Sequence, residues 1–271
     1  MDEQTGSIGA ITDTTDWRGP DMAGRSDWIR QITDAHMDEV RSALAGVTAN
    51  GLQLGAFGKE DFPIPSFAEE LAWVQEQLQT GPGFALLRGF PVDDFTDPEL
   101  RLIYWGIGQH LGTPLAQSRH GDILGDVRDI GGTTKEEHGR GYTGKDELHF
   151  HSDGCDISGL FCLRVAKQGG LSQLVSAAAA HNEPNRHEVG GPLVGVGALH
   201  SDASGDAGEV APLEVAVDDG GQTGGHGRHV DVAVDGVAED LVRCGDQAAY
   251  LVRSGSTAAL RSCLPSTCRG P

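Results

Sequence analysis

Apolar residues recur at helical spacing in three stretches of the first half of the chain. Ser66 is a candidate N-cap for the second stretch, and Thr96 is one for the third, where Pro98 follows in the first turn. Gly81 and Gly112 stand where these two stretches end. The pattern therefore predicts three amphipathic helices, over residues 33–44, 66–80 and 96–111.

Short apolar runs separated by glycine-rich turns come next. Residues 84–90 form an almost uninterrupted apolar run, which is typical of a buried strand. Helices early in the chain and strands later favour an α+β fold with an antiparallel β core. Further strands are predicted over residues 123–127, 149–151, 158–165 and 171–176.

The composition changes abruptly at about residue 182. Residues 183–271 contain no Phe, Trp, Ile, Met or Lys, and Tyr250 is their single aromatic residue. Large apolar side chains dominate core energetics, so we expect this Gly/Ala/Val/Asp-rich tail to be poorly packed or disordered. Two explanations stay open: a flexible acidic extension, or a change of reading frame in the gene, since GC-rich DNA translated out of frame gives this bias. Residues 1–25, polar and rich in Gly, Thr and Asp, are expected to form a loose N-terminal arm.

Charge and cysteine usage exclude several classes of function. Twenty basic against forty acidic residues give a formal net charge of −20, which disfavours nucleic acid and anionic membranes as partners. No apolar run approaches the roughly 18 residues of a membrane span. The acidic N-terminus does not resemble a signal peptide, and the five scattered cysteines are typical of reduced thiols. We therefore expect a cytoplasmic protein.

The strongest candidates for metal-binding residues are His151 and Asp153, near the end of a predicted strand. Two positions apart on a strand, side chains point to the same face, so an imidazole and a carboxylate can converge on one metal ion. Two His and one carboxylate form the facial triad of non-haem Fe(II) oxygenases. His149 has the same parity, and only the spacing to Asp153 singles out His151; a structural role for such a histidine is the alternative.

Several segments around this motif carry a family resemblance. The motif is followed about twenty residues later by Gly169-Gly-Leu-Ser172, and the sequence segments that flank it also carry the resemblance. Together these segments resemble the TauD/TfdA (taurine dioxygenase-like) family of Fe(II)- and 2-oxoglutarate-dependent oxygenases, over residues 1–182. The resemblance implies a double-stranded β-helix, or jelly roll. Residues 26–182 are expected to form its N-terminal helices and its first strands, and the jelly roll is expected to be incomplete at the C-terminus. The segments that carry it are residues 83–90, 108–114, 125–131, 140–142, 149–153, 159–164 and 169–176.

The resemblance also implies a ligand set. His151 and Asp153 are the expected iron ligands, and Ser172 is the expected contact to a carboxylate of the cosubstrate 2-oxoglutarate, with O2 as the second cosubstrate. The family's distal histidine and its 2-oxoglutarate-binding arginine lack a recognisable context here. His229 and Arg243 are weak candidates by spacing, and His200 and His226 are the other histidines considered.

The expected function is hydroxylation of an unactivated C–H bond of a small-molecule substrate, with Arg140 and Tyr142 as candidates for lining the substrate entrance. Two alternatives remain. One is a catalytically inactive, truncated or frame-altered relative that lacks the distal His and Arg. The other is a cupin-like metal protein that does not use 2-oxoglutarate.

Overall fold

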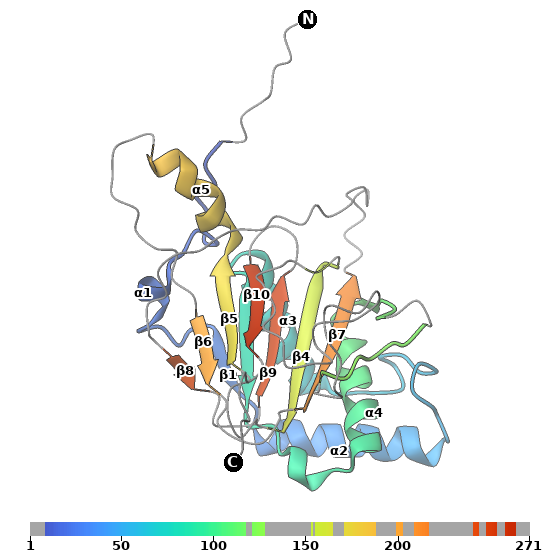
Figure 1. Cartoon of the computed structure of the whole chain (residues 1–271). Helices are drawn as coiled ribbons and strands as arrows, with labels where there is room; N and C mark the ends of the chain where they lie inside the picture. The colour runs from blue at the N-terminus through green and yellow to red at the C-terminus, as the bar shows by residue number, and fades with distance from the viewer. Residues whose placement is uncertain are drawn as a thin grey trace, which may run out of the picture.

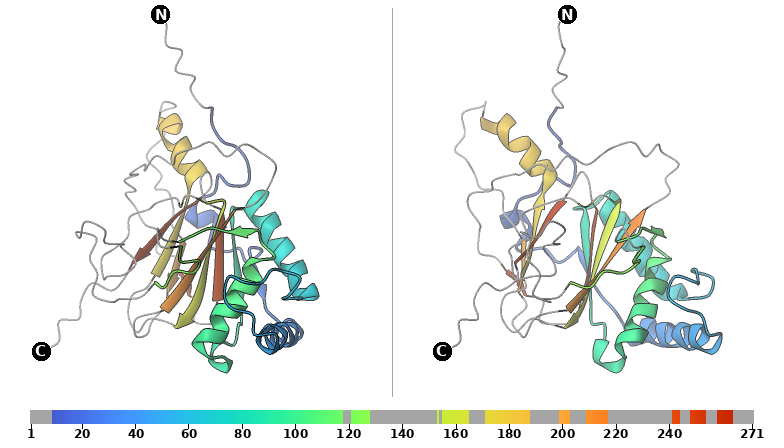
Figure 2. Two further views of the ribbon diagram at one scale, coloured as in Figure 1. Left: turned by 90° about the vertical axis from the view of Figure 1, so that its right-hand side faces the viewer. Right: turned by 45° about the vertical axis from the view of Figure 1, so that its right-hand side comes forward.

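The structure, a computed structural model, describes residues 9–117, 121–127, 153, 155–164, 171–187, 199–202, 209–216, 241–243, 248–253 and 258–263. Two β-sheets form its centre (Figure 1). Figure 2 shows the three long N-terminal helices against one side of the larger sheet and the smaller sheet on its other side. The mixed α+β class expected from the sequence is confirmed.

The three helices predicted from apolar periodicity are present. They are α2 (Asp34–Ala49), α3 (Pro65–Gln79) and α4 (Asp97–Gly108). Thr33 caps α2, its side chain accepting a hydrogen bond from the His36 backbone N–H. Thr96 begins α4 as predicted, in a capping box with Glu99. The helix ends at Gly108 rather than just before Gly112, because the chain continues there as a turn closed by the bond from Gly112 N to Gly108 O.

The prediction that Ser66 caps α3 is wrong. The N-cap position is Ile64, whose side chain makes no capping bond, and Pro65 is the first helical residue. Ser66 lies within the first turn, and its backbone N–H is bound by the Glu39 carboxylate of α2 at 3.0 and 3.1 Å. A neighbouring helix therefore satisfies the N–H groups that a local cap would have taken.

The larger sheet has six strands in the order β1-β2-β9-β4-β7-β3. All its neighbours are antiparallel except β1 and β2. Strand β9, from the C-terminal part of the chain, lies between β2 and β4, which come earlier in the sequence. The bounds are β1 (Ile29–Gln31), β2 (Phe84–Arg88), β9 (Ala248–Arg253), β4 (Ile157–Arg164), β7 (Glu209–Ala216) and β3 (Thr113–Pro114).

The smaller sheet has four strands in the order β10-β5-β6-β8, with only β6 and β8 parallel. Its strands are β10 (Ala258–Cys263), β5 (Leu171–Ser176), β6 (Leu199–Asp202) and β8 (Leu241–Arg243). The remaining elements are the short helix α1 (Gly19–Met22), the 3-10 turn η1 (Val92–Asp94) and α5 (Ala177–His187).

The predicted strands over residues 84–90, 158–165 and 171–176 are confirmed as β2, β4 and β5. The strand predicted over 123–127 is wrong, because that stretch forms bends with a single bridge residue at Val127. Its apolar residues pack without a strand: Leu124 is buried and Ile123 lies against the core. The strand predicted over 149–151 lies outside the described residues.

The core lies between α2, α3, α4 and the larger sheet. Phe161 of β4 is its aromatic centre, 4.9 Å from the Phe90 ring and 5.1 Å from the Tyr104 ring, centroid to centroid. The indole N–H of Trp105 donates to the Phe57 carbonyl at 2.9 Å. The ring contacts of Phe161 hold β4 against the helical layer, and β4 is the strand that follows the candidate motif in the sequence.

The described part of the N-terminal arm contacts both the helical layer and α5. Trp17 is buried, and its indole N–H donates to the Pro82 carbonyl at 2.8 Å. The Ile11 backbone N–H donates to Asn182 Oδ1 at 2.9 Å. Strands β6 to β10 belong to the tail and pair within the two sheets. That the tail packs poorly stays a prediction. No helix in the described part of the chain is long and apolar enough to cross a membrane.

Candidate functional site

Asp153 is held just ahead of β4, a strand paired on both sides. Ile157, the first residue of β4, lies opposite Arg253 of β9 and Val215 of β7. Asp153 itself is half-buried and lies in neither helix nor strand, and Cys155 follows in a bend. The carboxylate therefore lies four residues ahead of a strand that is paired on both sides.

A serine within β4 reaches back to this carboxylate. Ser158, only 7% exposed, donates its hydroxyl proton to Asp153 Oδ2 at 2.5 Å. The same hydroxyl oxygen lies 3.2 Å from the Sγ atom of Cys155, which is also 3.4 Å from the Ile157 carbonyl oxygen. An ionised carboxylate only accepts hydrogen bonds, so the serine must be the donor to it.

The donor chemistry of the motif fits Fe(II). A carboxylate oxygen and a neutral imidazole two positions apart are ligand types that non-haem iron uses. Asp153 is placed as described above, whereas His151 lies outside the described residues. In the described ranges no group of three or more His, Cys, Asp and Glu residues that could hold a metal is present.

The remaining sequence candidates that the structure describes lie on three strands of the smaller sheet. Ser172 lies in β5, opposite Ser201 of β6 and Ser262 of β10. Arg243 lies in β8 opposite Asp202, one position out of the row that contains Ser172, so the register does not align these two. His200 lies in β6 opposite Gln173. His149, His226, His229, Arg140 and Tyr142 lie outside the described residues.

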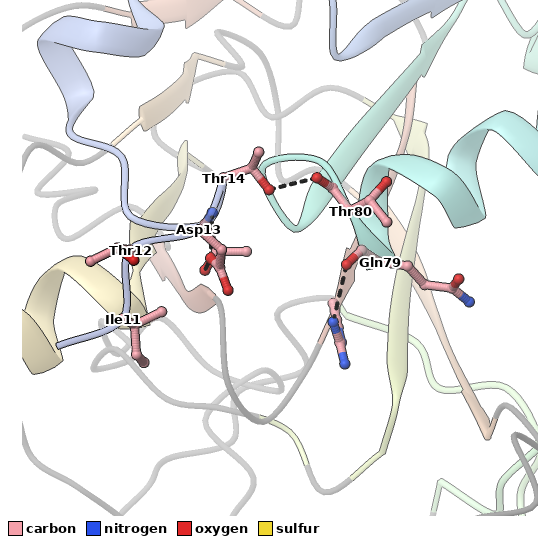
Figure 3. A pocket seen from close by; sticks show the side chains of 8 residues that line it. Ile11, Thr12, Asp13, Thr14, Gln79 and Thr80 are labelled. Carbon is pink, nitrogen blue, oxygen red and sulfur yellow. Dashed lines mark hydrogen bonds between the residues drawn. The ribbon is translucent and has the colours of Figure 1, made fainter. Parts of the chain in front are cut away.

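A polar hollow opens at the same end of the larger sheet. Figure 3 shows its walls: the N-terminal residues 11–15, Gln79 and Thr80 at the end of α3, and Arg253. Its volume is about 880 Å³. Thr14 closes one side by donating to the Thr80 carbonyl at 2.5 Å. Because Arg253 lies directly opposite Ile157, the hollow belongs to the end of the sheet at which β4 begins.

The hollow has a mixed electrostatic character. Its carboxylate is Asp13, whose pKa is lowered chiefly by the hydrogen bond from the Thr15 side chain and further by the charge of Arg253. Arg253 Nη1 also lies 3.5 Å from the Gln79 carbonyl oxygen. Threonine hydroxyls supply most of the remaining polar lining, and those of Thr14 and Thr15 are hydrogen-bonded within the protein.

Ser158 is the residue at this site that the sequence alone did not single out. The available signal is weak: a hydroxyl at a buried position of a strand that is otherwise apolar around it. Such a group needs a hydrogen-bond partner, and the partner here is the carboxylate five residues earlier.

An α+β fold with two sheets and a His-x-Asp motif leading into a central strand is typical of non-haem iron oxygenases. The chain belongs to the taurine catabolism dioxygenase TauD, TfdA family, whose model matches residues 48–187. Membership confirms the family resemblance recognised in the sequence, and it places the chain in a family of dioxygenases.

Two curated relatives match the same part of the chain. FR-33289 synthase of Streptomyces rubellomurinus is 32% identical over 173 residues, which are 64% of this chain and 51% of the relative. The taurine hydroxylase-like protein SAT17 of Stachybotrys chartarum is 28% identical over 181 residues, covering 64% of this chain and 47% of the relative. The chain thus spans about half the length of the curated relatives it matches.

Among solved structures, the fold is similar to asparagine oxygenase in complex with Fe(II), 2S,3S-3-hydroxyasparagine and succinate. The TM-score is 0.52 at 15% sequence identity, and the match covers 90% of each chain. At this identity the likeness concerns the fold alone.

Proposed function

We propose that the chain is an Fe(II)- and 2-oxoglutarate-dependent dioxygenase that hydroxylates an unactivated C–H bond of a small-molecule substrate. His151 and Asp153 are the proposed iron ligands. The observation that carries the proposal is that the family match over 48–187 includes both residues, while Asp153 is anchored by Ser158 at the start of a rigid strand.

The protein's part in this reaction is positional. When bound, Fe(II) supplies the redox chemistry that couples oxidative decarboxylation of 2-oxoglutarate to hydroxylation of the substrate. His151 and Asp153 hold the metal, and Ser172 offers a hydroxyl to a cosubstrate carboxylate. In this proposal no side chain of the protein is required as a general acid or base.

The two sheets are proposed to be those of a double-stranded β-helix, with the iron at the end where β4 begins. The likeness to asparagine oxygenase supports this arrangement, as does the antiparallel pairing of β4 with β9 and β7. In this proposal residues 26–182 form the helices and first strands of the jelly roll. The third iron ligand and the cosubstrate arginine are left unassigned, because the register does not align Arg243 with Ser172.

Turnover of the cosubstrate tests the proposal. The purified chain, supplied with Fe(II), ascorbate, O2 and 2-oxoglutarate, is expected to form succinate even without its substrate. Removing a residue that hydrogen-bonds to a metal ligand weakens metal binding by about 10–100-fold. D153A removes a proposed ligand itself, so it is expected to lower succinate formation by more than about 100-fold. D156N is the matched control, because Asp156 is an exposed carboxylate three residues away. Wild-type chain that forms no succinate, or D153A with unchanged turnover, would contradict the proposal.

The second candidate function is a catalytically inactive relative. It is favoured by one observation: the family match ends at residue 187, although the chain continues to residue 271. This candidate predicts no Fe(II) binding and ready proteolysis after about residue 182. A cupin-like protein predicts instead tight metal binding that 2-oxoglutarate leaves unchanged.

A further inference from the structure

We propose that Ser158 is a positioning residue that fixes the Asp153 carboxylate for metal ligation. This inference rests on the proposed function, since it concerns the same metal site. Its starting point is the hydrogen bond of 2.5 Å from Ser158 Oγ to Asp153 Oδ2.

The two partners differ in how firmly the backbone holds them. Ser158 is the second residue of β4, opposite Val252 on one side and Glu214 on the other. Asp153 precedes the strand and belongs to no regular element. A side chain in irregular backbone has several staggered rotamers open to it, and a hydrogen bond from a fixed donor selects one of them. Because Ser158 is held in the sheet, its hydrogen bond restricts the rotamers of the Asp153 side chain.

The pleat of β4 places Ser158 on the side of the sheet that faces away from the helices. Ile157, Phe161 and Leu163 belong to the core beneath the helices. Because successive residues of a strand alternate between faces, Ser158 lies on the face opposite to these residues. The smaller sheet lies on that side of the larger sheet (Figure 2). A metal held between the two sheets would be approached from this face, so the serine is on the correct side to act on its ligand.

Burial increases the energetic value of the contact. A hydroxyl that is 93% buried costs free energy unless it is hydrogen-bonded. The nearby Cys155 thiol is only a weak hydrogen-bonding group, so the carboxylate is the strong partner of the serine. Orienting Asp153 and satisfying Ser158 are therefore accomplished by one bond. Outer partners of this kind usually govern metal affinity by holding the ligand in its binding geometry.

Equilibrium binding of Co(II), a spectroscopic substitute for Fe(II), tests the inference without turnover. S158A is expected to bind Co(II) about 10–100-fold more weakly than the wild type and to alter its visible absorption, because a loosened carboxylate changes the coordination geometry. S158T keeps the hydroxyl and is expected to restore both the affinity and the spectrum. Alanine is smaller than serine, so S158A is expected to fold, which its thermal unfolding midpoint checks.

Two controls separate positioning from general loss of structure. S176A removes another fully buried serine hydroxyl, one that donates to the Thr15 carbonyl rather than to Asp153. C155A removes the thiol neighbour but leaves the bond between Ser158 and Asp153 in place. Both are expected to retain wild-type Co(II) affinity.

The outcomes are distinguishable. Wild-type chain that binds no Co(II) would overturn the proposed function and this inference with it. Wild-type binding that D153A abolishes and S158A leaves unchanged would overturn the inference alone. Equal weakening in S158A and S176A would also overturn it, because the effect would then follow from lost packing.

Discussion

Glu39 illustrates how one side chain acts on a helix other than its own. From α2, its carboxylate accepts hydrogen bonds from the backbone N–H groups of Ser66 and Phe67 in the first turn of α3, at 3.0 to 3.1 Å. Burial alone would raise the pKa of Glu39, but the hydrogen bonds from Ser66 and Phe67 outweigh it and lower the pKa below its ordinary value. The charged form is therefore the one that stabilises the fold.

The sign of the pH dependence follows from this direction. A carboxyl group whose pKa is lower in the folded than in the unfolded chain contributes stability above its unfolded pKa and loses it as pH falls through the folded one. E39Q is therefore expected to lower the free energy of unfolding by about 1 kcal/mol at pH 7 and by less at pH 3. Urea unfolding at both pH values measures this. E69Q, which changes an exposed carboxylate of α3, is the control; an equal loss in E39Q at both pH values would contradict the account.

At the residue scale the sequence predicts what depends on spacing and misses what depends on tertiary contact. The spacing of His151 and Asp153 is visible in the sequence, but the strand geometry expected for the pair does not extend to Asp153, which lies in no strand. The capping of α3 by Glu39 was missed, since the partners are 27 residues apart. The bond from Ser158 to Asp153 was missed because an irregular bend brings them together.

The packing is close where α4 crosses the core. Gly106 of α4 lies against the ring of Phe62, and a Cβ atom added there would be 2.4 Å from the ring's Cγ. By contrast, a Cβ atom at Gly46 in α2 would meet nothing within 4 Å. Both glycines lie in helices, so the same substitution is expected to have opposite effects at the two positions.

Two matched variants test this contrast. G46A is expected to raise the free energy of unfolding by about 0.5–1 kcal/mol, because alanine is the better helix former. G106A has the same intrinsic gain, but the clash with the fully buried Phe62 is expected to cost about 1–3 kcal/mol and to dominate. Urea unfolding of both variants measures the difference. A G106A variant as stable as G46A would show that the contact with Phe62 relaxes freely.

Element prediction succeeded where one pattern dominates. The helices α2, α3 and α4 follow from apolar residues at helical spacing, and β4 and β5 from short apolar runs. The stretch 123–127 has a strand-like composition, but its apolar side chains reach the core from a looped backbone. A local apolar pattern predicts that a residue is buried, but it does not determine whether a strand or a loop brings that residue to the core.

At the scale of the whole molecule, the order of strands is beyond local sequence patterns. The larger sheet places β9 between β2 and β4, although more than 80 residues separate it from β4 along the chain. The unusual composition of the tail gave no sign of this pairing. The family match over residues 48–187 includes α3, α4, β2, β4 and β5, which the sequence predicted.

The central claim is that the His151–Asp153 motif holds iron for a 2-oxoglutarate-dependent reaction. Anaerobic equilibrium dialysis of the full chain with Fe(II), with and without 2-oxoglutarate, tests it most directly. The account predicts about one iron per chain, bound more tightly when 2-oxoglutarate is present and lost in D153A, because the cosubstrate and the carboxylate share one metal. Iron binding that is absent in the wild type, unchanged in D153A, or indifferent to 2-oxoglutarate would contradict it.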